Sequence, residues 1–445
     1  CTGLTQFVVA DENPYFSSYD GAIYSKDYSN LLFAPNGKEG ILDIHENTKV
    51  IKGLALIGCG KITTVTIPNS VKTIGVKAFR DCTALSSLVI GTGVEDISSG
   101  AFMYCNSLTT VVIPENVVKI EASAFDSCAK LNSVTIQGSL TSIKPRSFAG
   151  CTSLTQITLP KDLAFIENNA FSECFLLETI EFGDKLEVIG SYAFSGCEKL
   201  KSVVIPTSVT LICDNAFSDC SSLETIEIPE NVASIENHAF CGCKKLSEVT
   251  IKGPITVINS YLFSKCISLK QCVIPSTVTM IDMYAFSECR NLIEVVIPES
   301  VTAIFSNAFK GCDGLTTITI PQNVALIASD AFYNCKGLKE FVVAEDNPSF
   351  SVHKGAVYTK DYSILLFVPN GIQNTIEIFK STVSIGDTAF MGCAKLTQIT
   401  IPDTVNLIGD EAFCDCSELA SISFGKGLES IGSYVFSGCG KLTSF

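Results

Sequence analysis

The 445-residue chain has no tryptophan and only three histidines, and charged residues make up just 17% of its sequence. Acidic residues outnumber Lys and Arg by 46 to 31, which gives a formal net charge of −15. Because nucleic acids and anionic membranes attract basic surfaces, this composition argues against binding to either. The chain also lacks an apolar run of about 18 residues, so the sequence predicts no membrane-spanning segment.

Signatures of catalysis are missing as well. The three histidines, His45, His238 and His353, stand at unrelated repeat positions and have no plausible catalytic partner nearby in the sequence. A catalytic histidine needs a nucleophile and an orienting group around it. Glycine-rich nucleotide loops, the HExxH motif and EF-hand loops do not occur. We therefore expect no enzymatic activity and no cofactor.

Cysteine, in contrast, is abundant and regularly spaced. In most of the chain a Phe–x–x–Cys motif recurs every 23 residues. The cysteines at this spacing are Cys59, Cys82, Cys105, Cys128, Cys151, Cys174, Cys197, Cys220, Cys243, Cys266, Cys289, Cys312 and Cys335, and after a longer interval Cys393, Cys416 and Cys439. A fixed period of about 20–50 residues is typical of a solenoid, in which each repeat buries its apolar face against its neighbours.

A single repeat follows the pattern LxxVxIPxxVxxIxxxAFxxC. Its LxxVxI part alternates, so Val111 and Ile113 share one face of a predicted strand that ends at the following proline. The VxxI part predicts a brief extended stretch on the opposite wall. The segment around Ala124 and Phe125 predicts one or two turns of α- or 3₁₀-helix. The expected structural core includes Phe79, Phe102, Phe125, Phe194, Phe286, Cys82 and Cys128.

These motifs resemble the leucine-rich repeats of the 23-residue bacterial surface antigen type, which is called BspA-like. The resemblance covers essentially the whole chain, because AFxxC and IP recur together in register. It implies one continuous, right-handed and gently curved β/α solenoid over residues 1–445. A parallel β-sheet would line the concave wall, and short helical turns would complete each coil. The family is associated with surface adhesins of anaerobic bacteria and parasitic protists.

Two intervals of 58 residues, Cys1 to Cys59 and Cys335 to Cys393, interrupt the repeat and match each other at about half their positions. We expect hairpin-containing insertions at 11–46 and 345–380, with a four-residue turn at 26–29 in the first. Their tyrosines are either contact anchors or packing groups that hold the hairpin on the solenoid. The candidate contact residues are Tyr15, Tyr19, Tyr28 and Tyr362. Positions that differ between the copies (Tyr15/Ser349 and Tyr19/His353) are favoured, because packing should constrain the shared ones.

The cysteines of the repeat are expected to be reduced, buried thiols. Equivalent side chains on successive coils run parallel, about 4.8 Å apart, whereas a disulfide brings its Cβ atoms to about 3.8 Å. Cys272 replaces a core valine and should also be buried, while Cys213, Cys241 and Cys414 should be the most accessible. No set of four ligands converges on the CxC pairs, so we expect no metal site.

The outward positions of the predicted sheet are mostly Ser and Thr, interrupted by Val112, Val204, Val273 and Val296. Acidic residues gather midway along this face, where they either steer a basic partner or simply keep the surface solvated. They are Glu178, Glu181, Glu224, Glu227, Glu248 and Glu294. A face this poor in aromatic residues and arginine lacks typical hot spots, so any binding should be weak and repeated.

The sequence favours a non-enzymatic adhesion or ligand-binding protein at the cell surface or secreted. Its expected partner is a host matrix or cell-surface glycoprotein, or another microbe, and not a nucleic acid. The alternative is a structural spacer or coat element that self-associates weakly through its ends, with the ligand site elsewhere. The chain opens at Cys1, at the repeat position, and closes at Phe445 inside a predicted strand, so we expect a fragment of a longer array.

Overall fold

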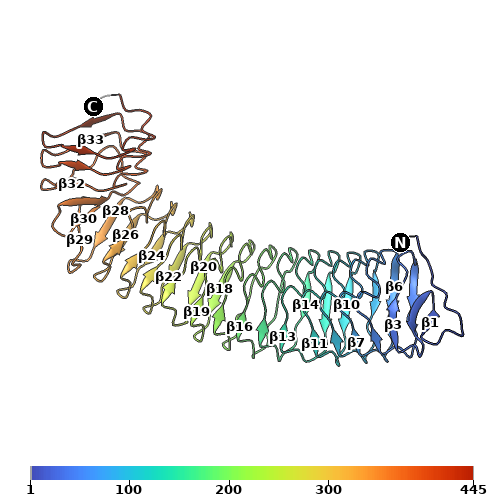
Figure 1. Cartoon of the computed structure of the whole chain (residues 1–445). Coiled ribbons are helices and arrows are strands. Elements are labelled where there is room, and N and C mark those ends of the chain that lie inside the picture. The colour runs from blue at the N-terminus through green and yellow to red at the C-terminus, as the bar shows by residue number, and fades with distance from the viewer. Residues whose placement is uncertain (1–2, 444–445) are drawn as a thin grey trace. The chain divides into compact units, whose positions relative to one another are not determined.

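The computed structural model describes residues 3–443, which form similar coils built from β-strands and turns (Figure 1). The chain divides into two compact units, Cys1–Leu223 and Glu224–Phe445. The expected continuity of one solenoid over residues 1–445 stays a prediction. Cys1 and the strand expected at Phe445 lie outside the described residues.

Most ordinary coils contribute one longer and one two-residue strand, whereas the coils of β16 and β17 contribute only the two-residue strand. In the first unit the long strands are β4 (Gly40–Asp43), β6 (Ile62–Thr66), β8 (Ser87–Val89), β10 (Thr110–Ile113), β12 (Ser133–Ile136) and β14 (Gln156–Thr158). The short strands are β5 (Val50–Ile51), β7 (Thr73–Ile74), β9 (Asp96–Ile97), β11 (Lys119–Ile120), β13 (Ser142–Ile143), β15 (Phe165–Ile166), β16 (Val188–Ile189) and β17 (Leu211–Ile212).

The second unit repeats the same plan. Its long strands are β18 (Thr225–Ile228), β20 (Glu248–Ile251), β22 (Gln271–Val273), β24 (Glu294–Val296), β26 (Thr317–Ile320), β28 (Glu340–Val343), β33 (Gln398–Thr400) and β35 (Ser421–Ser423). Its short strands are β19 (Ser234–Ile235), β21 (Val257–Ile258), β23 (Met280–Ile281), β25 (Ala303–Ile304), β27 (Leu326–Ile327), β32 (Ser384–Ile385), β34 (Leu407–Ile408) and β36 (Ser430–Ile431).

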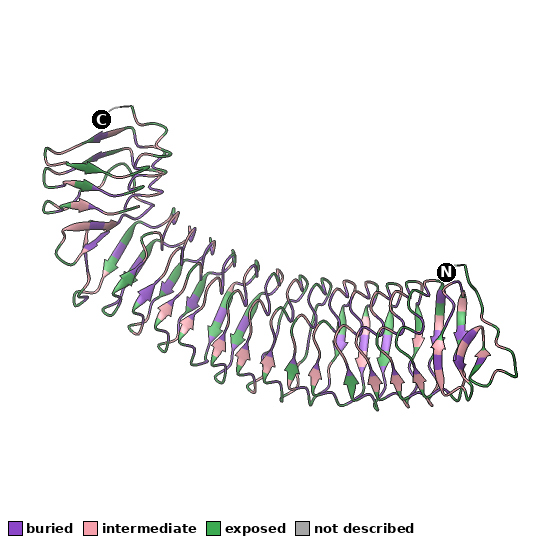
Figure 2. Ribbon diagram, viewed as in Figure 1, coloured by how far each residue is buried: buried purple, intermediate pink, exposed green. Residues whose placement is uncertain are grey.

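Strand pairing between ordinary coils is parallel, and paired residues stand one repeat apart. Val111 of β10 pairs with Val134 of β12, and Ile97 of β9 pairs with Ile120 of β11. Inward and outward residues therefore keep their places from coil to coil, as the alternating colours along the strands in Figure 2 illustrate. The predicted parallel β-solenoid is confirmed.

The predicted helical turns are wrong: no helix occurs in residues 3–443, and the AFxxC segments are runs of turns. In one such segment Phe79 N–H donates to Ala101 of the next coil at 2.7 Å, whereas Cys82 N–H donates back to Phe79 at 3.2 Å. A helix would use all of these donors locally. Lys77 and Asp81 also have φ of 54° and 62°, which interrupts any right-handed helix. Alternate N–H groups therefore donate to the neighbouring coil instead of to carbonyls of their own segment.

The phenylalanines of these segments stack through the centre of each unit. Phe79 and Phe102 lie 5.0 Å apart between ring centroids, and Phe102 and Phe125 lie 5.1 Å apart, with their rings nearly parallel. The residues expected in the core, namely Phe79, Phe102, Phe125, Phe194, Phe286, Cys82 and Cys128, have no exposed surface. The stack provides the apolar burial that a single coil cannot provide for itself.

The ladder cysteines are hydrogen-bond donors as well as small core residues. Cys105 Sγ lies 3.2 Å from the carbonyl oxygen of Phe79, and Cys128 Sγ lies at the same distance from that of Phe102. Each thiol thus reaches a buried carbonyl of the preceding coil, which the sequence did not reveal. Every cysteine among the described residues is a thiol rather than half of a disulfide.

Alkylation with iodoacetamide should separate two classes of cysteine in the native protein. Cys213, Cys241, Cys414 and Cys439 are half-buried and should be modified first. The fully buried ladder thiols should resist until the chain unfolds, because burial raises the pKa of Cys128 to about 12 and keeps it protonated. Peptide mass spectrometry after mildly alkaline labelling measures both classes. Modification of Cys128 as fast as Cys213 would contradict this assignment.

Each insertion is a three-stranded antiparallel sheet. The first contains β1 (Phe16–Tyr19), β2 (Ala22–Ser25) and β3 (Asn30–Phe33), and the second contains β29 (Phe350–His353), β30 (Ala356–Thr359) and β31 (Ile364–Phe367). Strands β2 and β3 enclose residues 26–29, so the predicted hairpin and its four-residue turn are confirmed. Strands β3 and β31 then pair in parallel with β5 and β32, which returns the chain to the short-strand ladder.

The 58-residue intervals contain a hidden ladder position. Asn36 and Asn370 stand 23 residues before Cys59 and Cys393, where a cysteine would be expected. Asn370 donates through Nδ2 to the carbonyl of Met391 at 2.7 Å, and its Oδ1 accepts from Cys335 N–H at 3.1 Å. Each interval is therefore one lengthened coil that ends in the ladder asparagine, followed by an ordinary coil that ends in cysteine. The spacing of the sequence already contained this signal.

Candidate interaction surfaces

The six glutamates predicted to cluster are divided between the two units. Glu178 and Glu181 belong to the first unit, in a coil whose long strand is not assigned, and the other four belong to the second unit. Glu178 lies 3.8 Å from the amino group of Lys201, and Glu227 lies 2.6 Å from that of Lys252. Lysines on adjacent coils thus neutralise part of the predicted acidity.

Two of the glutamates do come together beside a hollow of the second unit. Glu248 of β20, Gln271 of β22 and Glu294 of β24 are successive partners in the parallel register. They line a hollow of about 390 Å³ together with Ser247, Lys270 and Ile293. Here carboxylates, one ammonium group and an aliphatic side chain face solvent at the same place.

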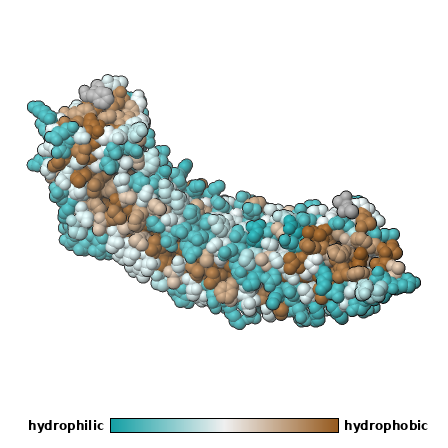
Figure 3. Space-filling view, in the orientation of Figure 1, coloured by the Kyte–Doolittle hydropathy of each residue, from teal (hydrophilic) through white to brown (hydrophobic). Residues whose placement is uncertain are grey.

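Apolar side chains continue this surface. Val273 and Val296 are direct partners on β22 and β24 and are 68% and 60% exposed, and neighbouring Ile293 is 62% exposed. Figure 3 shows that such apolar patches alternate with hydrophilic areas on the visible face of the molecule. The sequence marked both valines as interruptions of the Ser/Thr face, but only the register sets them side by side with the glutamates.

The tyrosines of the insertions differ in their surroundings. Tyr15 is 74% exposed, whereas Tyr28 stacks on His45 with ring centroids 4.1 Å apart. Tyr362 stacks in the same way on Phe379 at 4.3 Å. Tyr28 and Tyr362 are therefore held in ring clusters within their insertions, and Tyr15 is the candidate that projects from its own.

Each of the two ring clusters contains one histidine, but at a different position of the insertion. In the first, Tyr19 packs edge-on to His45 at 5.0 Å; in the second, His353 packs edge-on to Phe379 at 5.1 Å. Tyr19 also donates to Asp43 Oδ2 at 2.6 Å. The difference between Tyr19 and His353 suggested a contact position. It is matched by a compensating difference in the same cluster, where His45 corresponds to Phe379.

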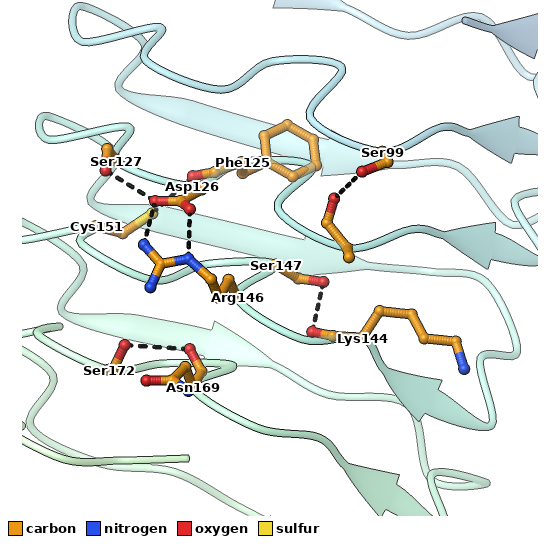
Figure 4. Close-up of polar contacts among 11 residues, drawn as sticks. Ser99, Phe125, Asp126, Ser127, Lys144, Arg146, Ser147, Cys151, Asn169 and Ser172 are labelled. Atoms are coloured by element: carbon orange, nitrogen blue, oxygen red, sulfur yellow. Dashed lines mark hydrogen bonds and ion pairs between the residues drawn. The ribbon is translucent and has the colours of Figure 1, made fainter. Parts of the chain in front are cut away.

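A buried carboxylate in the first unit was not anticipated from the sequence. Asp126 has no exposed surface, and its two oxygens accept hydrogen bonds from Arg146 Nε at 2.9 Å and Nη2 at 3.3 Å (Figure 4). The hydroxyl of Ser127 donates to the same carboxylate at 2.8 Å. Because the charge is paired and hydrogen-bonded, this group is a cross-coil brace rather than a reactive acid.

The polar groups of the described region do not converge on a reactive centre. All three histidines pack against aromatic rings, His238 by stacking on Tyr261 at 4.5 Å. Within residues 3–443 there is no group of three or more His, Cys, Asp or Glu side chains that could hold a metal ion. The arrangement offers exposed surfaces for contact, with apolar and charged groups in fixed rows.

Comparison with known sequences identifies the repeat. The profile of the "BspA type Leucine rich repeat region (6 copies)" matches residues 38–132, 118–247, 210–339 and 368–445, which together make up most of the chain. The chain belongs to the BspA type leucine-rich repeat family. Proteins of this family are generally binding scaffolds without catalytic activity, and the matching profile indicates no catalytic family. No curated protein sequence matches the chain.

Solved structures of bacterial leucine-rich repeat proteins are similar to this BspA-type chain. A protein from Bacteroides ovatus is 22% identical, with 98% of this chain and 93% of that chain covered and a TM-score of 0.43. A "leucine rich cell surface protein" from Faecalibacterium prausnitzii is 21% identical, with 93% and 96% covered and a TM-score of 0.42. A protein from Eubacterium ventriosum is 22% identical, with 78% and 98% covered and a TM-score of 0.48. No helix in the described residues of this chain is long and apolar enough to cross a membrane.

Proposed function

We propose that this BspA-type protein is a non-enzymatic adhesion or ligand-binding protein, exposed at the cell surface or secreted. Its partner is a host matrix or cell-surface glycoprotein, or a surface protein of another microbe. The observation that carries this proposal is the row of exposed Val273 and Val296 beside Ile293, bordered by Glu248 and Glu294 around one hollow. We call these five residues the long-strand patch.

The chemistry of the long-strand patch fits protein recognition. Binding surfaces commonly combine an apolar centre with a polar rim, and strands of a parallel ladder hold such groups in a rigid row. The patch has no tryptophan, tyrosine or arginine, the residues that dominate strong hot spots. Individual contacts should therefore be weak, and firm attachment requires many copies at one surface.

Binding to immobilised fibronectin, fibrinogen, laminin and mucin tests the proposal. The whole chain should bind at least one of them, and the double variant Val273→Lys, Val296→Lys should bind at least about tenfold more weakly. The matched control is Val112→Lys, Val204→Lys, which places the same charges on exposed valines of the first unit. No binding by the parent, or equal losses in both double variants, would contradict this site.

A second candidate function is self-association through the first insertion. Phe16 and Phe33 are 43% and 57% exposed there. A second copy that covered these two rings would join two chains, as a coat or spacer element requires. Concentration-dependent mass in light scattering supports this candidate, and a strictly monomeric chain at high concentration counts against it.

A further inference from the structure

The short-strand ladder of the second unit is interrupted after β27, as it also is between β19 and β21. Strands β21, β23, β25 and β27 pair in succession, and the ladder stops at β27. The next sheet consists of β29, β30, β31, β32, β34 and β36, and none of these strands pairs with β27. One edge of β27 therefore has no strand partner inside the second unit.

The cause is a change of partner at the second insertion. In the ordinary coil, Leu326 N–H donates to Thr302 at 3.2 Å and Ala328 N–H donates to Ile304 at 2.9 Å. In the following coil, Pro348 and Ser349 stand at the places of Ala325 and Leu326. Pro348 has no N–H, and the N–H of Ser349 donates to the side-chain oxygen of Asn347 at 2.8 Å, as does that of Phe350. The backbone therefore leaves the ladder and turns into β29.

Two carbonyl groups are left at the open edge. Ala325 and Ile327 occupy the repeat positions of Thr302 and Ile304, whose oxygens accept bonds from the next coil. Among residues 3–443, no recorded hydrogen bond ends on the oxygen of Ala325 or Ile327. The edge thus presents two acceptors with the spacing that a parallel strand uses.

An apolar hollow adjoins this edge. Its volume is about 320 Å³, and its lining includes Leu326, Ile327, Phe350, Leu366 and Phe367. Leu326 is 50% exposed, whereas Ile327 and both phenylalanines are nearly buried. Backbone acceptors beside a pocket for an apolar side chain are the two components of recognition by strand addition.

We propose that the open edge of β27 binds an extended peptide segment of a partner protein as an added parallel strand. Two N–H groups of the segment, two residues apart, donate to the oxygens of Ala325 and Ile327, as the following coil does elsewhere in the ladder. The aliphatic side chain between them enters the hollow beside Ile327, and the first donor residue lies beside Leu326. The acidic residue Asp387 on the lining favours basic residues at the ends of the segment. This site is separate from the long-strand patch, so either can fail without the other.

The test uses fluorescein-labelled peptides and the whole chain, with binding followed by fluorescence polarisation. The probe is acetyl-Lys-Val-Ile-Val-Lys-amide, in which the two valine N–H groups are the intended donors and isoleucine is the inserted side chain. The control peptide carries N-methyl groups on both valines, which removes these donors but leaves the charges and apolar groups. We expect the methylated peptide to bind at least about tenfold more weakly.

Two protein variants supply the matching control. Leu326→Ser should weaken binding of the unmethylated probe at least about fivefold, because it removes an exposed apolar contact at the edge. Leu407→Ser should have no effect, because Leu407 holds the same repeat position and is 41% exposed, but β34 is paired on both sides. Equal binding of both peptides, equal effects of both variants, or no binding by the parent would each overturn the proposal.

Discussion

Replacing Phe194 by alanine should lower the free energy of unfolding by about 3–5 kcal/mol, the usual cost of removing a buried phenylalanine ring. Phe194 has no exposed surface, and its ring lies between those of Phe171 and Phe217, 5.3 Å from each. Alanine would leave a cavity that both neighbouring rings border. Since each coil is stabilised mainly by its neighbours, the damage should be concentrated in the coils on either side.

Urea denaturation followed by circular dichroism gives the free energy, and amide hydrogen exchange locates the loss. The control is Phe165→Ala in the same unit, because Phe165 is exposed on β15 and its ring should contribute little. Protection should fall in the coils around Phe194 and persist in the second unit. Equal destabilisation by the two substitutions would show that the central stack does not carry the stability assigned to it.

Replacing Asn347 by alanine should cost about 3 kcal/mol or more. The side chain is fully buried and donates to the carbonyls of Pro321 and Val324 at 2.7 and 3.0 Å, while its oxygen accepts from two N–H groups of the following turn. Each buried polar group left without a partner costs about 1–3 kcal/mol. Alanine would leave the carbonyl of Val324 and the N–H groups of Ser349 and Phe350 without this partner, while the carbonyl of Pro321 keeps its bond from Val324 N–H.

The first insertion supplies the matched control for this substitution. Asn13 caps the equivalent turn by accepting from Tyr15 and Phe16 N–H, both at 2.9 Å, and these bonds are exposed. Asn13→Ala should therefore cost about 1 kcal/mol or less, since water can replace the lost acceptor. Urea denaturation of both variants measures the difference. Similar losses at the two positions would contradict the role given to the buried bonds of Asn347.

The regular part of the fold could be predicted from the spacing of residues. The inward places of Val111 and Ile113, the parallel stacking of coils and the turn at 26–29 all follow from short patterns that repeat. Each of these features depends on residues close in sequence, or on the same residue one repeat later. The Asn36 and Asn370 ladder positions were equally open to prediction, since they stand at the repeat distance from the next cysteine.

The turn segments and candidate sites required the structure. The AFxxC segment has the length of a helical turn, but alternate N–H groups such as that of Phe79 donate to the next coil, which no local pattern expresses. Of the glutamates named by the sequence prediction, Glu178 and Glu227 pair with lysines and Glu248 and Glu294 belong to the long-strand patch, because strand register decides which side chains become neighbours.

By itself the sequence determined the repeat, its family and the inward face of each coil, because these are properties of one coil copied many times. Only the tertiary structure showed where the repeated strand pairing stops. Asn347 and Pro348 turn one backbone out of the ladder, and the carbonyls of Ala325 and Ile327 are consequently left open beside a hollow. Such an edge arises where the adjacent coil does not offer its backbone N–H groups to the strand. It therefore depends on how two coils meet and not on the sequence of either coil alone.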